Sequence, residues 1–143
     1  MAFEDGPFIS ACCFCDMAIK DVTGTLSLIR IIDVITHAGS GPNPPVDMPA
    51  FDHELKLVII LRSGMARGRS MLKIVPEEPD GSSGKPLELS VHFDGEEKGA
   101  NVVIDLRYRF KLEGLYWFDV YIDDQKINSI PLRIKYQRMI SGG

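Results

Sequence analysis

The chain has 143 residues, of which 45% are hydrophobic and 25% are charged, and its formal net charge at pH 7 is −4. These fractions are those of a globular protein and exclude a chain that is disordered throughout. The length fits one domain with an ordinary core, so we expect residues 1–143 to form a single domain. The net negative charge makes a nucleic acid a poor candidate for the partner.

The first residues carry none of the features of a secretory signal. They lack a basic region and have two acidic residues where such a signal is positive. The apolar run that follows is short and is interrupted by Asp16, so we expect no membrane span. The cysteines, Cys12, Cys13 and Cys15, are odd in number and too close together to join distant segments by disulfides. We therefore expect a cytoplasmic protein.

The first strand is predicted near Phe8–Lys20 and contains the stretch Ala-Cys-Cys-Phe-Cys-Asp. In a strand, Cys13 and Cys15 share a face with Cα atoms about 6.6 Å apart, and two sulfurs on one zinc ion would have to lie closer. Cys12 and Cys15 have the spacing of a redox motif, but a strand lacks the helix N-terminus that lowers a thiol pKa. We predict buried thiols without metal or cofactor; the candidates for a metal would be Cys13, Cys15 and His37.

A turn over residues 21–24 joins this strand to the next one in a hairpin. The natural register pairs Lys20 with Leu26 and therefore sets Asp16 opposite Arg30. Both charges interrupt apolar strands, and a buried carboxylate without a partner would be costly. We predict a structural ion pair between Asp16 and Arg30 that holds the hairpin in register.

The second strand, predicted near Thr25–His37, is apolar on both faces. Either a bulge near Arg30 switches its alternation, or the sheet is covered on its second side. In a two-layer protein that cover would come from another subunit, so we expect a homodimer. The hairpin register also sets Asp33 near Cys13, on the face opposite to the Asp16–Arg30 pair.

The remaining chain reads as strands separated by turns. Alternation is regular in the later strands, which is typical of antiparallel sheets with one dry and one wet face. A proline-rich stretch over residues 39–49 suits a long crossover between two sheets. We therefore predict an all-β protein with little helix, an antiparallel β-sandwich of about eight strands. The further strands are expected near His53–Arg62, Ser70–Val75, Leu87–Phe93, Val102–Leu112, Leu115–Asp123 and Ile130–Tyr136.

The segment Gly-Leu-Tyr-Trp-Phe, residues 114–118, favours an immunoglobulin-like, Greek-key form of this sandwich. In such domains a tyrosine near the start of the sixth strand bonds back to the backbone at the preceding corner. We expect a core of this type at Gly114, Tyr116 and Phe118, with the two aromatic side chains buried. Trp117 should then lie on the opposite face of the strand.

Three groups of motifs are distributed along the chain. They are Phe-Cys-Asp at 14–16 with Thr-Gly-Thr-Leu-Ser-Leu-Ile at 23–29 and Asp33; Pro-Ala-Phe at 49–51; and Gly-Leu-Tyr-Trp-Phe-Asp-Val at 114–120 with Asp123-Asp124 and Pro-Leu-Arg-Ile at 131–134. Together they resemble a family of small, uncharacterised bacterial β-sandwich proteins that is labelled only as a domain of unknown function. The resemblance implies a β-sandwich and a cytoplasmic bacterial protein. It brings no activity, so no catalytic residue is carried over.

The sequence contains no Gly-x-Ser-x-Gly elbow, no Walker loop and no Rossmann fingerprint. We therefore expect a non-enzymatic binding or assembly module that acts through protein contacts, without catalytic residues. The alternative is a small hydrolase or metal-dependent enzyme with a site near Asp16, Asp33, His37 and the cysteines. Stoichiometric zinc and protected thiols would favour that alternative. The sequence does not identify a small-molecule ligand.

Overall fold

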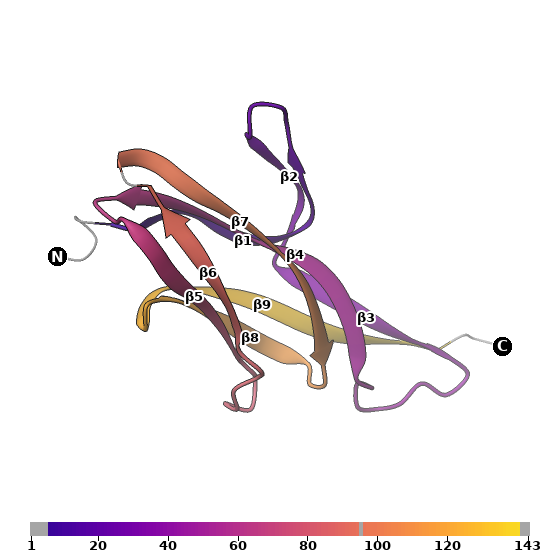
Figure 1. Cartoon of the computed structure of the whole chain (residues 1–143). Helices are drawn as coiled ribbons and strands as arrows, with labels where there is room; N and C mark the ends of the chain where they lie inside the picture. Colours follow the sequence, from indigo (N-terminus) through magenta and orange to yellow (C-terminus); the bar gives the residue numbers. More distant parts are fainter. Residues whose placement is uncertain (1–5, 95, 141–143) are drawn as a thin grey trace.

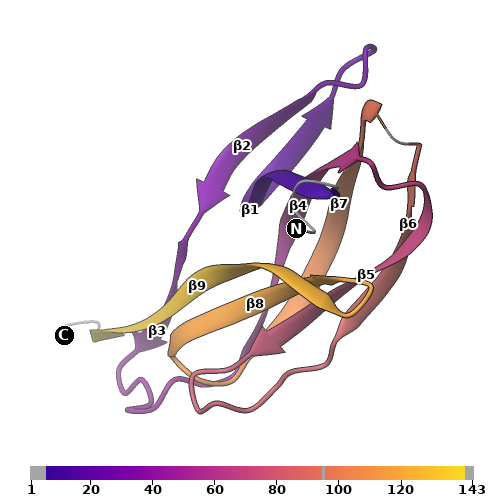
Figure 2. The same cartoon turned by 90° about the vertical axis from the view of Figure 1, so that its left-hand side faces the viewer.

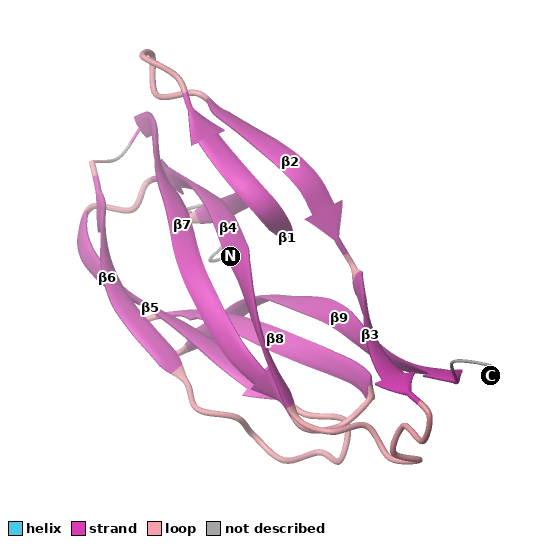
Figure 3. Ribbon diagram, turned by 90° about the vertical axis from the view of Figure 1, so that its right-hand side faces the viewer, coloured by secondary structure: helices cyan, strands magenta, loops and turns pink. Residues whose placement is uncertain are grey.

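The computed structural model describes residues 6–94 and 96–140, which contain nine strands in two sheets and no helix (Figures 1 and 3). Sheet A has the order β2-β1-β4-β7, and sheet B has the order β3-β9-β8-β5-β6. The bounds of β1 and β6 are those predicted from the sequence. The strands are β1 (Phe8–Lys20), β2 (Leu26–Ile32), β3 (Val34–Gly41), β4 (Phe51–Gly64), β5 (Gly68–Glu77), β6 (Leu87–Phe93), β7 (Glu96–Phe110), β8 (Gly114–Ile122) and β9 (Gln125–Ile140).

The single strand predicted near Thr25–His37 is wrong, and this is why the strands number nine and not about eight. The chain bends at Asp33, so that β2 pairs with β1 in sheet A and β3 pairs with β9 in sheet B. The backbone carbonyl of Asp33 accepts a hydrogen bond from the N–H of Arg133 (3.0 Å) and ties the bend to sheet B. The β3–β9 pair is parallel, so the prediction of a purely antiparallel fold fails here.

The two sheets face each other across one shared core (Figure 2). Phe14 and Leu57 reach this core from sheet A, and Phe118 and Leu132 reach it from sheet B; all four are fully buried. The rings of Phe14 and Phe118 meet edge to face with their centroids 4.9 Å apart. Burial of a side chain of this size contributes about 1.5–3 kcal/mol, so these contacts hold the two layers together.

The chain passes directly from sheet A to sheet B between β4 and β5. Gly64 and Gly68 flank this connection with φ angles of 56° and 86°, a left-handed conformation that glycine adopts without a Cβ clash. The N–H of Ala66 donates to the Ser63 carbonyl oxygen (2.9 Å) and closes the turn. The connection therefore sets neighbouring strands into opposite layers.

The β1–β2 hairpin stands away from the rest of sheet A (Figure 1). β1 pairs with β4 only over Phe8–Cys15, and with β2 over Phe14–Lys20. Beyond Cys15, β1 therefore keeps β2 as its only strand partner in the described part of the chain. The result is a two-stranded ribbon that is exposed on both faces.

Tyr116 bonds back to the backbone just before β8. Its hydroxyl donates to the Leu112 carbonyl oxygen (2.7 Å), and the Leu112 N–H donates to the same hydroxyl (3.2 Å). Gly114, between them, has a φ of 132°. Tyr116 and Phe118 are fully buried, and Trp117 on the other face is 38% exposed. This backbone contact is the one that the Gly-Leu-Tyr spacing predicts.

Candidate functional site

The outer face of sheet A, the side turned away from sheet B, is unusually apolar near the hairpin. Phe14 and Leu57 point into the shared core, and the next residues along each strand, Cys15 and Val58, point the other way. Cys15 and Val58 are nevertheless fully buried, although they are outside the core cluster. Side chains on the outer face therefore form a second, smaller apolar layer.

Exposed apolar side chains surround this layer. Ile31 is the cross-strand neighbour of Cys15, and Val103 is that of Val58. Ile29 and Met17 form the next pair out along the hairpin. All four are exposed, and Ile31 keeps 66% of its surface. Exposed apolar side chains grouped on one face make this surface a candidate interaction site. We refer to it as the outer patch, which comprises Met17, Ile29, Ile31 and Val103 with Cys15 and Val58 beneath them.

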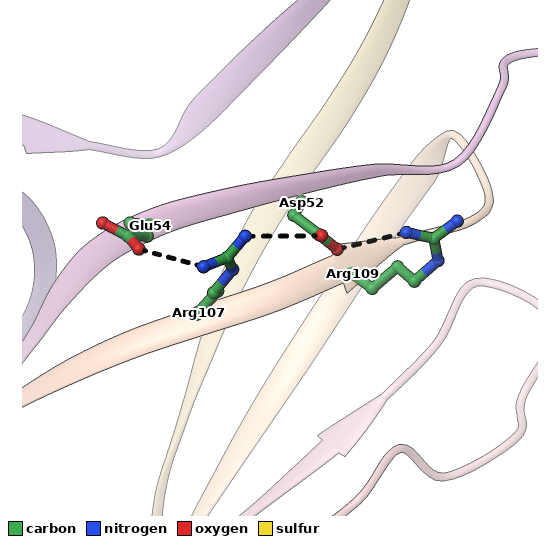
Figure 4. Close-up of polar contacts among 4 residues, drawn as sticks. All are labelled: Asp52, Glu54, Arg107 and Arg109. Atoms are coloured by element: carbon green, nitrogen blue, oxygen red, sulfur yellow. Dashed lines mark hydrogen bonds and ion pairs between the residues drawn. The ribbon is translucent and has the colours of Figure 1, made fainter.

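Charged side chains follow the outer patch along β4 and β7 (Figure 4). Arg107 approaches Asp52 (Nη2–Oδ2 3.7 Å) and Glu54 (Nη1–Oε1 3.6 Å). Arg109 approaches the other oxygen of Asp52 (Nη1–Oδ1 3.4 Å). These side chains are well exposed, and exposed ion pairs contribute at most about 1 kcal/mol each. Their main effect is to neutralise one another.

An ion pair between Lys56 and Asp105 continues this row toward the outer patch. The resulting charged ladder has three acids and three bases and no net charge: Asp52, Glu54 and Asp105 against Lys56, Arg107 and Arg109. A hollow of about 530 Å³ lies between part of the ladder and Asp16 at the base of the hairpin. Its described lining contains carboxylates and cations but no serine, cysteine or histidine. The hollow therefore brings side chains of both charges together.

Asp16 and Arg30 lie opposite each other in the hairpin, in the register that the sequence predicts. Lys20 pairs with Leu26, and the register has no shift between β1 and β2. Arg30 Nε is 3.1 Å from Asp16 Oδ2. The premise that this pair is buried is wrong, because the two side chains are 78% and 37% exposed. The ribbon stands clear of the core, so water solvates both charges. The alternation of β2 is not switched by a bulge either.

The backbone conformation of Arg30 restricts substitutions here more than the ion pair with Asp16 does. Its φ of 55° lies in the left-handed region, which is strained for β-branched side chains and free for glycine. We expect Arg30→Val to lower the free energy of unfolding by about 1–3 kcal/mol, and Arg30→Gly to change it by less than about 1 kcal/mol. Asp16→Asn, which removes only the charge, should cost at most about 1 kcal/mol. Urea unfolding checks all three; a cost for Asp16→Asn above that for Arg30→Val would contradict this account.

The cysteines divide between the two faces of β1. Cys12 packs against the core, and Cys13 and Cys15 lie on the outer face. All three are free thiols. Burial, and secondarily the neighbouring Cys13, raises the pKa of Cys12 from 9.0 to about 12. Burial is also the main cause that raises the pKa values of Cys13 and Cys15. The thiols are therefore protonated at neutral pH and poor nucleophiles.

We expect the native thiols to react with a disulfide reagent at pH 8 at least about tenfold more slowly than the thiols of the unfolded chain, because the thiolate is the reactive species. The raised pKa of Cys12 also links folding to pH: its contribution to stability is complete below pH 9 and is lost as the pH rises toward 12. Rates of reaction with the disulfide reagent in buffer and in guanidinium, for the wild type and Cys12→Ala, measure the predicted difference in thiol reactivity. A native thiol that reacts as fast as in the unfolded chain would contradict it.

The structure does not gather the residues of the alternative metal or hydrolase site. His37 lies on β3 in sheet B, where its ring stacks on Phe51 with centroids 4.1 Å apart. Asp33 forms the bend between the sheets, and Cys13 and Cys15 belong to sheet A. Among the side chains that the structure describes, no three histidine, cysteine or acidic residues lie close enough to hold a metal ion.

Sequence reasoning missed the charged ladder. Alternation predicts one wet face on each of the later strands, but it does not identify which charged residues of β4 and β7 pair across these faces. The sequence does contain the pattern of this ladder, because Asp52, Glu54 and Lys56 occupy alternate positions of the strand, with His53 and Leu55 between them. Antiparallel pairing of two such strands with opposite charges predicts a ladder of this kind.

The model of a family described as "Family of unknown function (DUF6941)" matches residues 10–135. No curated protein matches the chain. The described part of the chain also contains no helix of the length and hydropathy needed to cross a membrane.

Proposed function

Because the chain belongs to the Family of unknown function (DUF6941), its role has to be inferred from its own surfaces, and we propose that it is a non-enzymatic assembly module that forms a homodimer. The observation that carries this proposal is the outer patch. Exposed Met17, Ile29 and Ile31 lie on one face of a ribbon that stands out from the molecule. In water such a surface gains free energy when another apolar surface covers it.

Two features favour a second copy of the chain as the cover. The charged ladder beside the outer patch has no net charge, so two copies can bring these faces together without repulsion there, although each chain carries −4 overall. β2 is also an edge strand with no proline and with Arg30 as its only charged residue. Edge strands of monomers usually carry more protection. A two-fold axis would place the same patch on both sides of the interface.

The proposal includes an immunoglobulin-like, Greek-key β-sandwich in a single domain. The adjacency β5-β8-β9 in sheet B corresponds to strands C, F and G of such domains, and the β4–β7 pair corresponds to strands B and E. The bond from Tyr116 to the corner at Leu112 supports this assignment. Free cysteines, in turn, support a cytoplasmic location. An experimental structure with another strand order would overturn the fold assignment.

Light scattering over a concentration series tests the dimer. We expect the mass to rise from that of one chain, 15.9 kDa, toward twice that value between low and high micromolar concentration. A mass of one chain throughout the series would overturn the proposal. A mass that grows without limit would also do so, because a two-fold interface closes on itself.

A further inference from the structure

A second groove lies at the edge of sheet A opposite to the hairpin, between β7 and the loop that joins β5 to β6. It has a volume of about 620 Å³. β6 and β7 run side by side here along one side of the molecule (Figure 3), but each is the last strand of its own sheet. The groove therefore follows the open side between the two layers. Its lining comes from residues 106–109 and 111 on one side and from Glu78 and residues 83–87 on the other.

The rim of this groove is cationic. It carries Lys85, Arg107, Arg109 and Lys111 against one acid, Glu78. Glu78 is already engaged, because it accepts hydrogen bonds from the Tyr108 hydroxyl (3.0 Å) and the Ser82 hydroxyl (3.2 Å). Arg107 and Arg109 already pair with Asp52 and Glu54 outside the groove, so the positive charge offered to a ligand rests mainly on Lys85 and Lys111. An acidic ligand is the complementary one.

The floor of the groove is apolar. Leu87, Leu106 and Tyr108 line it, and all three are half-buried and pack against the core cluster. A ligand that occupies the whole groove must therefore present apolar side chains toward the floor and acidic side chains toward the rim.

The loop wall of the groove is held in place before any ligand arrives. The Gly84 N–H donates to the Pro76 carbonyl oxygen (2.8 Å), and the Glu78 N–H donates to the Ser82 carbonyl oxygen (2.8 Å). A Cβ at Gly84 would clash with the hydroxyl end of the Tyr108 side chain, so the loop approaches β7 closely at this position. Because the wall is preformed, binding need not order it.

The open edge of β7 leaves backbone groups to which a further strand can pair. β7 pairs with β4 on one side, and in the described ranges no strand pairs with its other side. A strand added there would continue sheet A through backbone hydrogen bonds. Its side chains would alternate: one set beside Leu106 and Tyr108 at the floor, the next beside Arg107 and Arg109. The same cations deter another cationic edge strand and so protect β7 from self-association.

We propose that this groove binds an extended segment of a partner protein in which acidic and apolar residues alternate, added as a further strand along β7. The inference goes beyond the homodimer, because the groove follows the edge of β7, whereas Met17, Ile29 and Ile31 of the outer patch lie on the hairpin at the other edge of sheet A. It gives the module a second interface, for a different protein. A dimer would then present two such grooves.

Fluorescence anisotropy with a labelled short peptide of alternating glutamate and valine tests this proposal. A control peptide has the same composition arranged in one glutamate block and one valine block. We expect the alternating peptide to bind at least about tenfold more tightly, since only it can place every acid at the rim and every valine at the floor. N-methylation of alternate backbone nitrogens, which removes ladder donors, should weaken binding to a similar extent.

The matched variants reverse charge inside and outside the groove. Lys85→Glu with Lys111→Glu should weaken binding of the alternating peptide at least about tenfold, whereas Arg133→Glu with Lys135→Glu on sheet B should not. If the two peptides bind equally, the groove attracts anions without regard to their order along the chain, and the proposal is overturned. It is also overturned if the alternating peptide does not bind, or if the two double variants weaken its binding equally. The Lys85 and Lys111 changes should leave the mass from light scattering unchanged, which separates this test from that of the dimer.

Discussion

We expect Phe118→Ala to lower the free energy of unfolding by about 3–5 kcal/mol, the usual cost of removing a buried aromatic ring. Phe118 is fully buried, and its ring lies close to two aromatic rings of sheet A. Its centroid is 4.9 Å from that of Phe14 and 5.6 Å from that of Tyr108. The substitution removes the apolar area and leaves a cavity where the two layers meet. Urea unfolding with matched m-values measures the loss.

Trp117→Ala is the matched control for this change. Trp117 is a larger aromatic residue, the next one along β8, but it lies on the outer side of sheet B and keeps 38% of its surface exposed. Its truncation should cost clearly less than that of Phe118. Equal costs would show that the core between the sheets is not where the stability of this fold resides.

We expect Ile31→Lys to raise the dissociation constant of the proposed homodimer at least about 100-fold, the effect of losing a central interface residue. Ile31 is the most exposed member of the outer patch, with Cys15 beside it. A two-fold interface contains position 31 twice, so each dimer would lose two apolar contacts and gain two like charges. Light scattering over a concentration series measures the change.

Val46→Lys is the control for this substitution. Val46 is an exposed aliphatic residue in the connection between β3 and β4, outside the outer patch. The same gain of charge there should leave the dimer intact. If both variants dissociate equally, net charge and not the patch controls association. If neither dissociates, the interface lies elsewhere.

The hairpin register shows how far the sequence carries a prediction. Asp16 stands opposite Arg30 because one turn and strict two-residue alternation leave a single register that keeps Phe14 in the core. Alternation predicts which residues share a face of a strand, but it does not predict whether the other sheet covers that face. The Asp16–Arg30 pair is therefore in the predicted register but not in the predicted environment.

The split at Asp33 could not be predicted for a related reason. Seven of the eleven residues 26–36 are apolar and they fall on both faces, so the run fits one buried strand as well as two strands that belong to different layers. Only the bend at Asp33 and its hydrogen bond from Arg133, a hundred residues later, separate these alternatives. Sequence pattern carries no signal for a contact of that range.

The contacts around Tyr116 were easier to predict because they are local. Gly114, Tyr116 and Leu112 lie within five residues, and the spacing alone sets the hydroxyl near the corner. The groove beside β7 was not predictable, since Lys85 and Lys111 come together only when two loops and two sheet edges meet.

Self-association through the outer patch can be tested by hydrogen–deuterium exchange of the wild-type protein at low and high concentration. We expect amides of residues 15–20 and 26–32 to exchange more slowly at high concentration, while those of the loop at 42–50 keep one rate. Exchange rates of the hairpin that do not depend on concentration, or protection confined to another edge such as β7, would contradict this expectation.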